Sequence, residues 1–167
     1  MAPHRNLADE VAAWFAARLP EHWFAAPVRT LVDKDEILVV GVLAVDAGAS
    51  PAECQAAALR FRAETKGARI ATATEAELTW QRKVSWAVEC GEVQVRYTTA
   101  SVPVMTRLRI DERLVLDTLI DAGVARSRSE ALGWCVRLVG QHQGDWIARL
   151  RQAVQSVEEV RADGPEL

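Results

Sequence analysis

Residues 104–142 carry the most informative pattern of the chain and read VMTRLRIDERLVLDTLIDAGVARSRSEALGWCVRLVGQH. Side chains of two kinds alternate across residues 105–110, which predicts a short strand with two different faces. Asp111 is the expected cap of a helix that ends at Gly123, a residue suited to the left-handed position after a helix. Ser127-Arg128-Ser129-Glu130 has the pattern of a capping box that opens a second helix. The predicted order is therefore strand, helix, turn, helix.

A single strand of about six residues followed by two helices can neither cover its own apolar face nor satisfy its own edge. We therefore expect a two-fold dimer in which the strand pairs antiparallel with its copy. The residues expected in the dimer core are the apolar ones that would face the helices: Leu108, Ile110, Leu119, Leu132 and Cys135.

The outer face of such a two-stranded ribbon would present Met105, Arg107 and Arg109 from both chains. A two-stranded ribbon fits the major groove of DNA, which is roughly 12 Å wide, and arginine can donate two hydrogen bonds to a guanine edge there. The whole chain has 20 basic and 23 acidic residues and a net charge of −3. The bulk positive charge typical of many DNA-binding domains is absent, so the prediction of DNA binding depends on the arginines of this segment.

This segment resembles the ribbon-helix-helix family of DNA-binding proteins, which includes the Met and Arc repressors. The resemblance rests on the alternating strand, on the helix that ends at Gly123, and on the capping pattern of residues 127–130. It implies base contacts from Met105, Arg107 and Arg109. It also implies phosphate contacts at the start of the second helix, where free backbone N–H groups favour an anion. These phosphate contacts are expected from Arg126, Ser127, Arg128 and Ser129.

Residues 1–101 predict a separate α+β domain with the element order α-β-β-α-α-β-β. Asn6 is the expected cap of a first helix that ends at Pro20, and residues 28–32 and 37–45 predict a β-hairpin. Ser50-Pro51-Ala52-Glu53 predicts the start of the next helix, because it combines a capping serine, a proline at the first helical position and a glutamate at the third. Two further strands are predicted, one from Val84 to Cys90 and one after Gly91. We expect an antiparallel sheet backed by helices.

The predicted domains are thus an α+β domain over 1–101, a ribbon-helix-helix module for DNA binding and dimerisation over 102–142, and a C-terminal segment over 143–167. The last segment is expected to form a helix from about Asp145 to Arg161, followed by a short acidic tail.

Several classes of chemistry receive no support from the sequence. The three cysteines, Cys54, Cys90 and Cys135, are far apart and match neither a disulfide framework nor a zinc pattern, so each is expected to be a small buried hydrophobic residue. The histidines are scattered, and the motifs of phosphate-binding loops, hydrolases and zinc proteases are missing. We expect no catalytic residues, no metal and no cofactor.

The longest uncharged apolar run, Ile37 to Val45, is much shorter than the roughly 20 residues that a membrane helix needs. No membrane association is expected. The first residues lack the apolar core and cleavage site of a secretory signal, which indicates a cytoplasmic protein.

Together these observations predict a DNA-binding transcriptional regulator that is not an enzyme. Its expected partners are double-stranded DNA, a second copy in a homodimer or higher homo-oligomer, and a small-molecule effector sensed by the amino-terminal domain. One alternative is an antitoxin or assembly protein that uses the ribbon only for dimerisation and partner binding. Another is a small enzyme or ligand-binding protein that acts through the amino-terminal domain. A separate interpretation of Arg107 and Arg109 is that they are only solvated residues that protect an edge strand.

Overall fold

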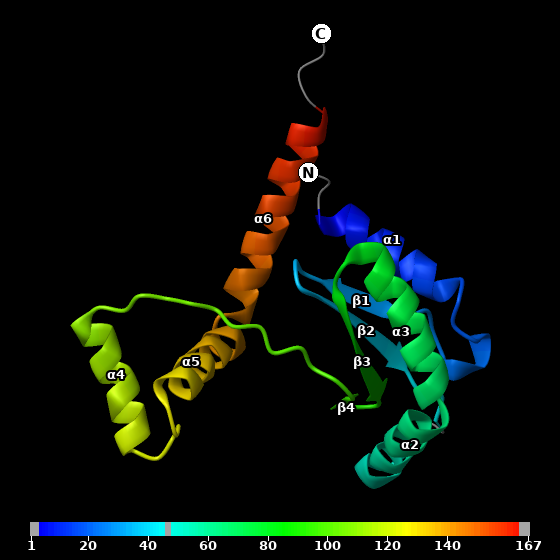
Figure 1. Ribbon diagram of the computed structural model, residues 1–167, viewed down its shortest axis with the longest axis horizontal. Coiled ribbons are helices and arrows are strands. Elements are labelled where there is room, and N and C mark those ends of the chain that lie inside the picture. Colours follow the sequence, from blue (N-terminus) through cyan, green and yellow to red (C-terminus); the bar gives the residue numbers. More distant parts are fainter. Residues whose placement is uncertain (1–3, 46–47, 164–167) are drawn as a thin grey trace. The chain divides into compact units, whose positions relative to one another are not determined.

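The computed structural model describes residues 4–45 and 48–163, and it divides into two compact units at the junction of Pro103 and Val104. The first unit has the predicted order of helices and strands, with one additional 3-10 helix, Glu21–Trp23. Its elements are α1 (His4–Ala16), β1 (Arg29–Val32), β2 (Glu36–Val42), α2 (Pro51–Glu64), α3 (Lys66–Trp80), β3 (Lys83–Cys90) and β4 (Val93–Arg96) (Figure 1).

The four strands form one sheet in the order β1-β2-β3-β4. β1 pairs with β2 and β3 pairs with β4 in antiparallel fashion, as predicted. The two central strands are parallel, with Ile37 opposite Val84, so the prediction of a wholly antiparallel sheet is wrong at its centre. The physical reason is the connection: α2 and α3 form a long crossover that returns the chain to the end of the sheet at which β2 began.

The helices α1, α2 and α3 share one hydrophobic core with the sheet, and Figure 1 shows α1 and α3 on the same side of the strands. Val11 and Phe15 of α1 are fully buried against this face, where Phe15 packs edge-on against Trp86 of β3 with ring centroids 5.7 Å apart. The opposite face of the sheet holds a smaller buried cluster of Leu38, Val40 and Ala87, which contains no helical residue.

The first helix starts earlier than predicted, because α1 begins at His4 and Asn6 lies within it. Asparagine costs only a few tenths of a kcal/mol to about 0.7 kcal/mol more than alanine inside a helix, so its preference for a capping position is easily overridden. The helix ends at Ala16, and hydrogen-bonded turns carry the chain to Pro20.

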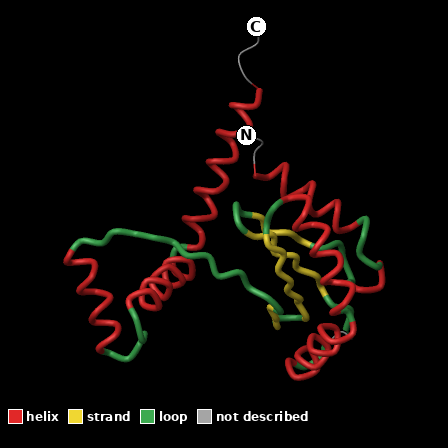
Figure 2. Tube along the Cα trace, in the orientation of Figure 1, coloured by secondary structure: helices red, strands yellow, loops and turns green. Residues whose placement is uncertain are grey.

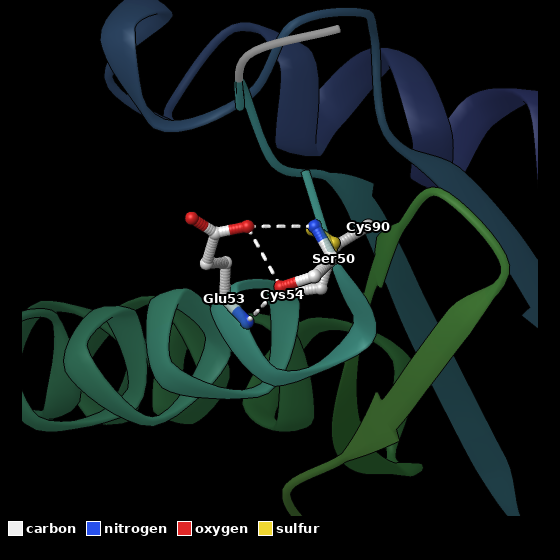
Figure 3. Close-up of a disulfide and its surroundings, with 4 residues drawn as sticks. All are labelled: Ser50, Glu53, Cys54 and Cys90. Carbon is white, nitrogen blue, oxygen red and sulfur yellow. Dashed lines mark hydrogen bonds between the residues drawn. A yellow bond between two sulfur atoms is a disulfide. The ribbon is translucent and has the colours of Figure 1, made fainter. Parts of the chain in front are cut away.

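The start of α2 is as predicted. The hydroxyl of Ser50 accepts a hydrogen bond from the backbone N–H of Glu53 (3.3 Å), and the carboxylate of Glu53 accepts one from the backbone N–H of Ser50 (2.7 Å). Pro51 occupies the first helical position, which needs no N–H donor. Figure 3 shows this reciprocal cap beside the first turn of α2.

Cys54 and Cys90 form a disulfide, so the expectation that all three cysteines are unpaired is wrong. Both side chains are buried as expected. The fold brings the first turn of α2 to the end of β3, where the two Cα atoms lie 5.4 Å apart (Figure 3). That separation is within the range of a disulfide, and the sequence spacing gives no information about it. Cys135 is a free, partly buried thiol.

The second unit is helical, with α4 (Ile110–Asp121), α5 (Arg128–His142) and α6 (Gly144–Asp163). The long C-terminal helix α6 is therefore present, within two residues of its predicted ends. The acidic tail was expected over residues 163–167, and all of it after Asp163 lies outside the described residues. Among the described helices, none combines the length and apolar character needed to cross a membrane.

Candidate nucleic-acid interface

The helices α4 and α5 form a hairpin around a small core of their own. Leu116, Ala125 and Ala131 are its buried residues. Gly123 has a φ of +75°, and its N–H donates to the carbonyl of Ile120, so the predicted stop of the first helix is confirmed. Four of the five residues predicted for the dimer core pack around this cluster while remaining partly exposed: Leu108, Leu119, Leu132 and Cys135.

The fifth predicted core residue, Ile110, differs from the others because it is the first residue of α4 and is 62% exposed. The helix thus begins one residue before its predicted cap, and Asp111 lies in its first turn. The capping role falls on Arg109, whose backbone N–H donates to the carboxylate of Glu112 (2.6 Å). Glutamate at the third helical position satisfies a free N–H in this way, and this contact moves the start of the helix to Ile110.

The segment 104–109 has no regular secondary structure within one chain, and Figure 2 draws the whole connection from β4 to α4 as loop. The predicted strand over 105–110 is therefore not formed in a single copy, and its last residue belongs to α4. The end of the segment is nevertheless fixed, because the guanidinium of Arg113 donates to the carbonyl oxygen of Leu108 (2.6 Å). This contact and the Glu112 cap define how the segment enters the helix.

The three residues predicted to contact bases are all exposed. Met105 is 96% exposed, and Arg107 and Arg109 are exposed on either side of the partly buried Leu108. Among the described residues, the guanidinium groups of these two arginines form neither an ion pair nor a hydrogen bond. Both therefore remain able to donate to an external acceptor.

The residues predicted to contact phosphate lie together at the start of α5. The hydroxyl of Ser127 accepts a hydrogen bond from the backbone N–H of Glu130 (3.2 Å), which confirms Ser127 as the helix cap. The carboxylate of Glu130 accepts from the backbone N–H of Arg126 (2.9 Å) instead of that of Ser127, so the predicted capping box is only half formed. Ser129 lies exposed in the first turn.

Arg128 makes an ion pair that the sequence did not indicate. Its guanidinium donates two hydrogen bonds of 2.7 Å to the carboxylate of Asp117 in α4, a bidentate arrangement that ties the two helices together. This hydrogen-bonded guanidinium lowers the pKa of Asp117 below its ordinary value of 3.8. The pairing was missed because the two residues lie on different helices, and only the i, i+3 and i, i+4 spacings within one helix are visible in a sequence.

Each helix of this unit also leaves apolar side chains exposed. These residues are Ile110, Leu114 and Val115 on α4, Val136, Leu138 and Val139 on α5, and Trp146, Leu150, Val154 and Val157 on α6. The spacing of those on α6 places them along one side of the helix. The other exposed apolar residues belong to α4 and α5, so all three helices of this unit present apolar side chains.

Within the described residues, no group of three or more His, Cys, Asp or Glu side chains is arranged to hold a metal ion.

Two protein-family models match the chain, one in each of its compact units. The model of the Rv1265-like protein N-terminal domain matches residues 9–96, and the model of the Mb1296 C-terminal domain matches residues 109–161. The two matches fall on the two compact units, one on each side of Pro103. The chain therefore consists of two family domains in tandem.

The chain belongs to the Rv1265-like family. It is 50% identical over 165 residues to Uncharacterized protein Rv1265 of Mycobacterium tuberculosis, and equally to Uncharacterized protein Mb1296 of Mycobacterium bovis. In both comparisons the match covers 96% of this chain and 72% of the relative. No solved structure matches the chain. The resemblance to ribbon-helix-helix proteins is independent of these matches and stays a prediction.

Proposed function

We propose that the chain is a homodimeric, sequence-specific DNA-binding regulator that inserts a two-stranded ribbon, built from segment 104–109 of two copies, into the major groove. The observation that carries the proposal is the exposure of this segment, which presents Met105, Arg107 and Arg109 immediately before a two-helix hairpin. An arginine without an internal partner can make the bidentate contact to guanine that reads sequence in that groove.

A second copy is the partner that this segment needs. Its backbone N–H and C=O groups at residues 104–107 enter no hydrogen bond among the described residues, and the neighbouring helices expose apolar side chains. Antiparallel pairing with a copy would give these backbone groups hydrogen-bond partners and would help to cover the exposed apolar side chains. The C-terminal helix α6 adds a further apolar side that a dimer could bury.

The start of α5 would hold the DNA backbone. Ser127, Arg128 and Ser129 surround the first free N–H groups of this helix, where the helix dipole favours a phosphate. Arg128 would have to exchange the carboxylate of Asp117 for phosphate oxygens, or share its donors between them. The phosphate contacts would fix the position of the ribbon without reading sequence.

The amino-terminal domain would control this binding. An effector that binds one arrangement of the two units better than another shifts the population towards it, and DNA affinity changes by the same coupling free energy.

The decisive experiment begins with the DNA sites recovered by immunoprecipitation and sequencing, followed by affinity measurements on one such site. We expect Arg107→Ala and Arg109→Ala each to cost about 1 to 3 kcal/mol of specific binding free energy, because each removes a bidentate base contact. Arg149→Ala together with Arg151→Ala is the matched control, since these exposed arginines lie on α6 and remove the same charge.

Sedimentation of the variants shows whether the dimer is intact. If the Arg107→Ala, Arg109→Ala double variant binds its DNA site with unchanged affinity, the ribbon does not recognise DNA and the proposal is wrong. An equal loss in the control would show that only general charge matters.

A further inference from the structure

A buried arginine without a counter-ion lies in the amino-terminal domain. Arg69 of α3 is only 6% exposed, and its guanidinium donates to the hydroxyl of Thr65 (2.9 Å) and to the carbonyl of Arg62 (2.8 Å). The group also lies 4.8 Å from the ring centroid of Tyr97 and 5.9 Å from that of Trp86. Among the described residues, no carboxylate pairs with it.

Tyr97 does not supply the missing negative charge. Its hydroxyl donates to the backbone carbonyl of Ala58 (2.7 Å), and burial raises the pKa of Tyr97 to about 12. The phenol is therefore neutral at physiological pH, and Arg69 remains charged because arginine keeps its proton in proteins. Neutral acceptors and aromatic faces compensate a buried charge only in part, and a buried charge without a counter-ion is destabilising.

Trp86 of β3 provides a second unsatisfied donor beside this arginine. The residue is 4% exposed, and among the described residues its indole Nε1–H has no hydrogen-bond partner. Buried N–H groups without a partner are rare in folded proteins, and an ion or a ligand is one of the explanations for those that occur.

Arg69 and Trp86 line the same cavity. It has a volume of about 250 Å³. The other residues that line it are Thr98 and residues of α3 and β3: Ile70, Ala73, Thr74, Glu77 and Val84. The hydroxyl of Thr98 accepts from the backbone N–H of Trp86 (3.1 Å) and keeps its own proton for a further acceptor. The cavity is thus lined by three residues that carry donor groups and by apolar residues.

One carboxylate also borders the cavity, and it determines which end can hold an anion. Glu77 accepts hydrogen bonds from the backbone N–H of Val84 (3.0 Å) and from the ammonium of Lys83 (3.3 Å). It lies eight residues after Arg69 on α3, which is about 12 Å along the helix. An anion is therefore favoured at the end with Arg69 and disfavoured at the end with Glu77.

A larger hollow of about 600 Å³ at the start of α2 lacks these properties. It is lined by Glu53 and Arg60 among other residues, and the Glu53 carboxylate is already engaged by Ser50. Among the residues that the structure describes, no buried side-chain donor without a partner borders it.

We propose that the cavity between α3 and β3 binds a small organic anion, a carboxylate or phosphate oxyanion attached to a compact apolar body, with the oxyanion at the end that Arg69 and Trp86 line. The apolar body would lie against Ile70, Ala73 and Val84. A volume of about 250 Å³ is at the small end of ligand sites, which limits the body to roughly one ring. Such an anion would be the effector of the proposed regulator. Ligand binding by the cavity does not depend on the proposed function, but an effect of the ligand on DNA affinity does.

The test follows the indole N–H signals of the full-length chain in a ¹H–¹⁵N spectrum, with Trp86→Phe to assign the signal of Trp86. The probes are benzoate and phenyl phosphate, with benzamide as the neutral analogue. We expect a saturable shift of the Trp86 signal with at least one of the two anions at millimolar concentration, and none with benzamide. A response to benzoate alone identifies a carboxylate site, and a response to phenyl phosphate alone identifies a phosphate ester site. No shift with either anion, or an equal shift with benzamide, overturns the proposal.

Two variants test the cavity itself. Arg69→Met should weaken binding more than tenfold, whereas Arg62→Met is the matched control, because Arg62 is exposed and does not line the cavity. Ala73→Leu should abolish binding by filling the cavity while leaving the guanidinium in place, so it decides the matter if Arg69→Met does not fold. Unchanged binding by Ala73→Leu overturns the proposal.

The ligand site and the ribbon can fail separately. The Arg107→Ala, Arg109→Ala double variant should show the same ligand shift as the unmodified chain, since neither residue belongs to the amino-terminal domain. If the chain does not bind DNA but shows the Trp86 shift, the ligand site is supported and the proposed DNA binding is wrong. If the chain binds DNA through Arg107 and Arg109 but shows no Trp86 shift with either anion, the ribbon is supported and the ligand site is overturned.

Discussion

Gly41 of β2 occupies a position where the ring of Phe24 takes up the space of a side chain. A Cβ atom at this position would lie 2.1 Å from Cε1 of Phe24. The ring in turn packs against Phe61 of α2, with centroids 5.2 Å apart. It therefore has little freedom to withdraw, and the close contact depends on the absence of a side chain at Gly41.

We expect Gly41→Ala to lower the free energy of unfolding by about 1 to 3 kcal/mol, the usual cost of overpacking a core. Urea denaturation measures the change. Gly67→Ala is the control, because no atom lies within 4 Å of a Cβ there and alanine is up to about 1 kcal/mol better than glycine inside a helix. Equal stabilities of the two variants would contradict the role given to Phe24.

The ion pair of Asp117 with Arg128 makes a second prediction at the same scale. Hydrogen bonds from Arg128 lower the pKa of Asp117 in the folded state, so its stabilising effect is present above the ordinary pKa of 3.8 and is lost as the pH falls through the lower folded value. We expect Asp117→Asn to be less stable than the unmodified chain at neutral pH and to approach it in stability below about pH 4.

Denaturation curves of both proteins over this pH range test the prediction. Arg126 provides a comparison, since it is highly exposed and its pair with Glu130 should matter less. A stability difference for Asp117→Asn that does not change with pH would assign the effect to packing instead of charge.

At the scale of elements, the disulfide joins the first turn of α2 to the end of β3 across a separation of 36 residues. Closing a loop of this length restricts the unfolded chain and should stabilise the domain by about 3 to 4 kcal/mol in the chain-entropy model. We expect reduction, or the Cys54→Ala, Cys90→Ala double variant, to lower the unfolding free energy by up to this amount.

The measurement is denaturation with and without reductant. Cys135→Ala is the control, because this cysteine is unpaired and its replacement should leave the response to reductant unchanged. A double variant as stable as the oxidised protein would show that packing of α2 against β3 is sufficient.

How far the sequence predicted these elements depends on the range of the interactions that form them. The start of α2, the hairpin of β1 and β2, and the stop at Gly123 follow from residues a few positions apart, and all three are confirmed. The parallel pairing of β2 with β3 and the Cys54–Cys90 bond depend on how the crossover helices pack, and no local pattern reports that.

The candidate sites show the same division. Met105, Arg107 and Arg109 were identified because alternation is a local signal, and they are exposed as a contact surface requires. Asp117 as the partner of Arg128, and Arg69 beside Trp86, were not identified. Each pair joins two separate elements, and of the four residues only Arg128 stands in a motif, which does not indicate its partner.

At the scale of the whole molecule, the proposed dimer makes a quantitative prediction about salt. About six phosphate contacts would make log K for DNA fall by about 5 for a tenfold rise in salt concentration. Replacing Arg128 by alanine removes one contact from each copy and should reduce this slope by about 2.

Binding isotherms at several salt concentrations give the slope, and sedimentation at micromolar concentration gives the oligomeric state. We expect a dimer under these conditions, because the apolar sides of α4, α5 and α6 need a partner. A monomer that binds DNA with the same slope would contradict the two-copy ribbon.

The parallel pair at the centre of the sheet also has a kinetic consequence. Because Ile37 pairs with Val84, β2 has no neighbour on one edge until the entire helical crossover has left the ribosome. Proteins dominated by such distant contacts fold slowly, whereas the α4–α5 hairpin depends on near neighbours and can form quickly. During synthesis the nascent amino-terminal domain therefore passes through an interval in which one edge of β2 is uncovered, and an uncovered strand edge favours aggregation.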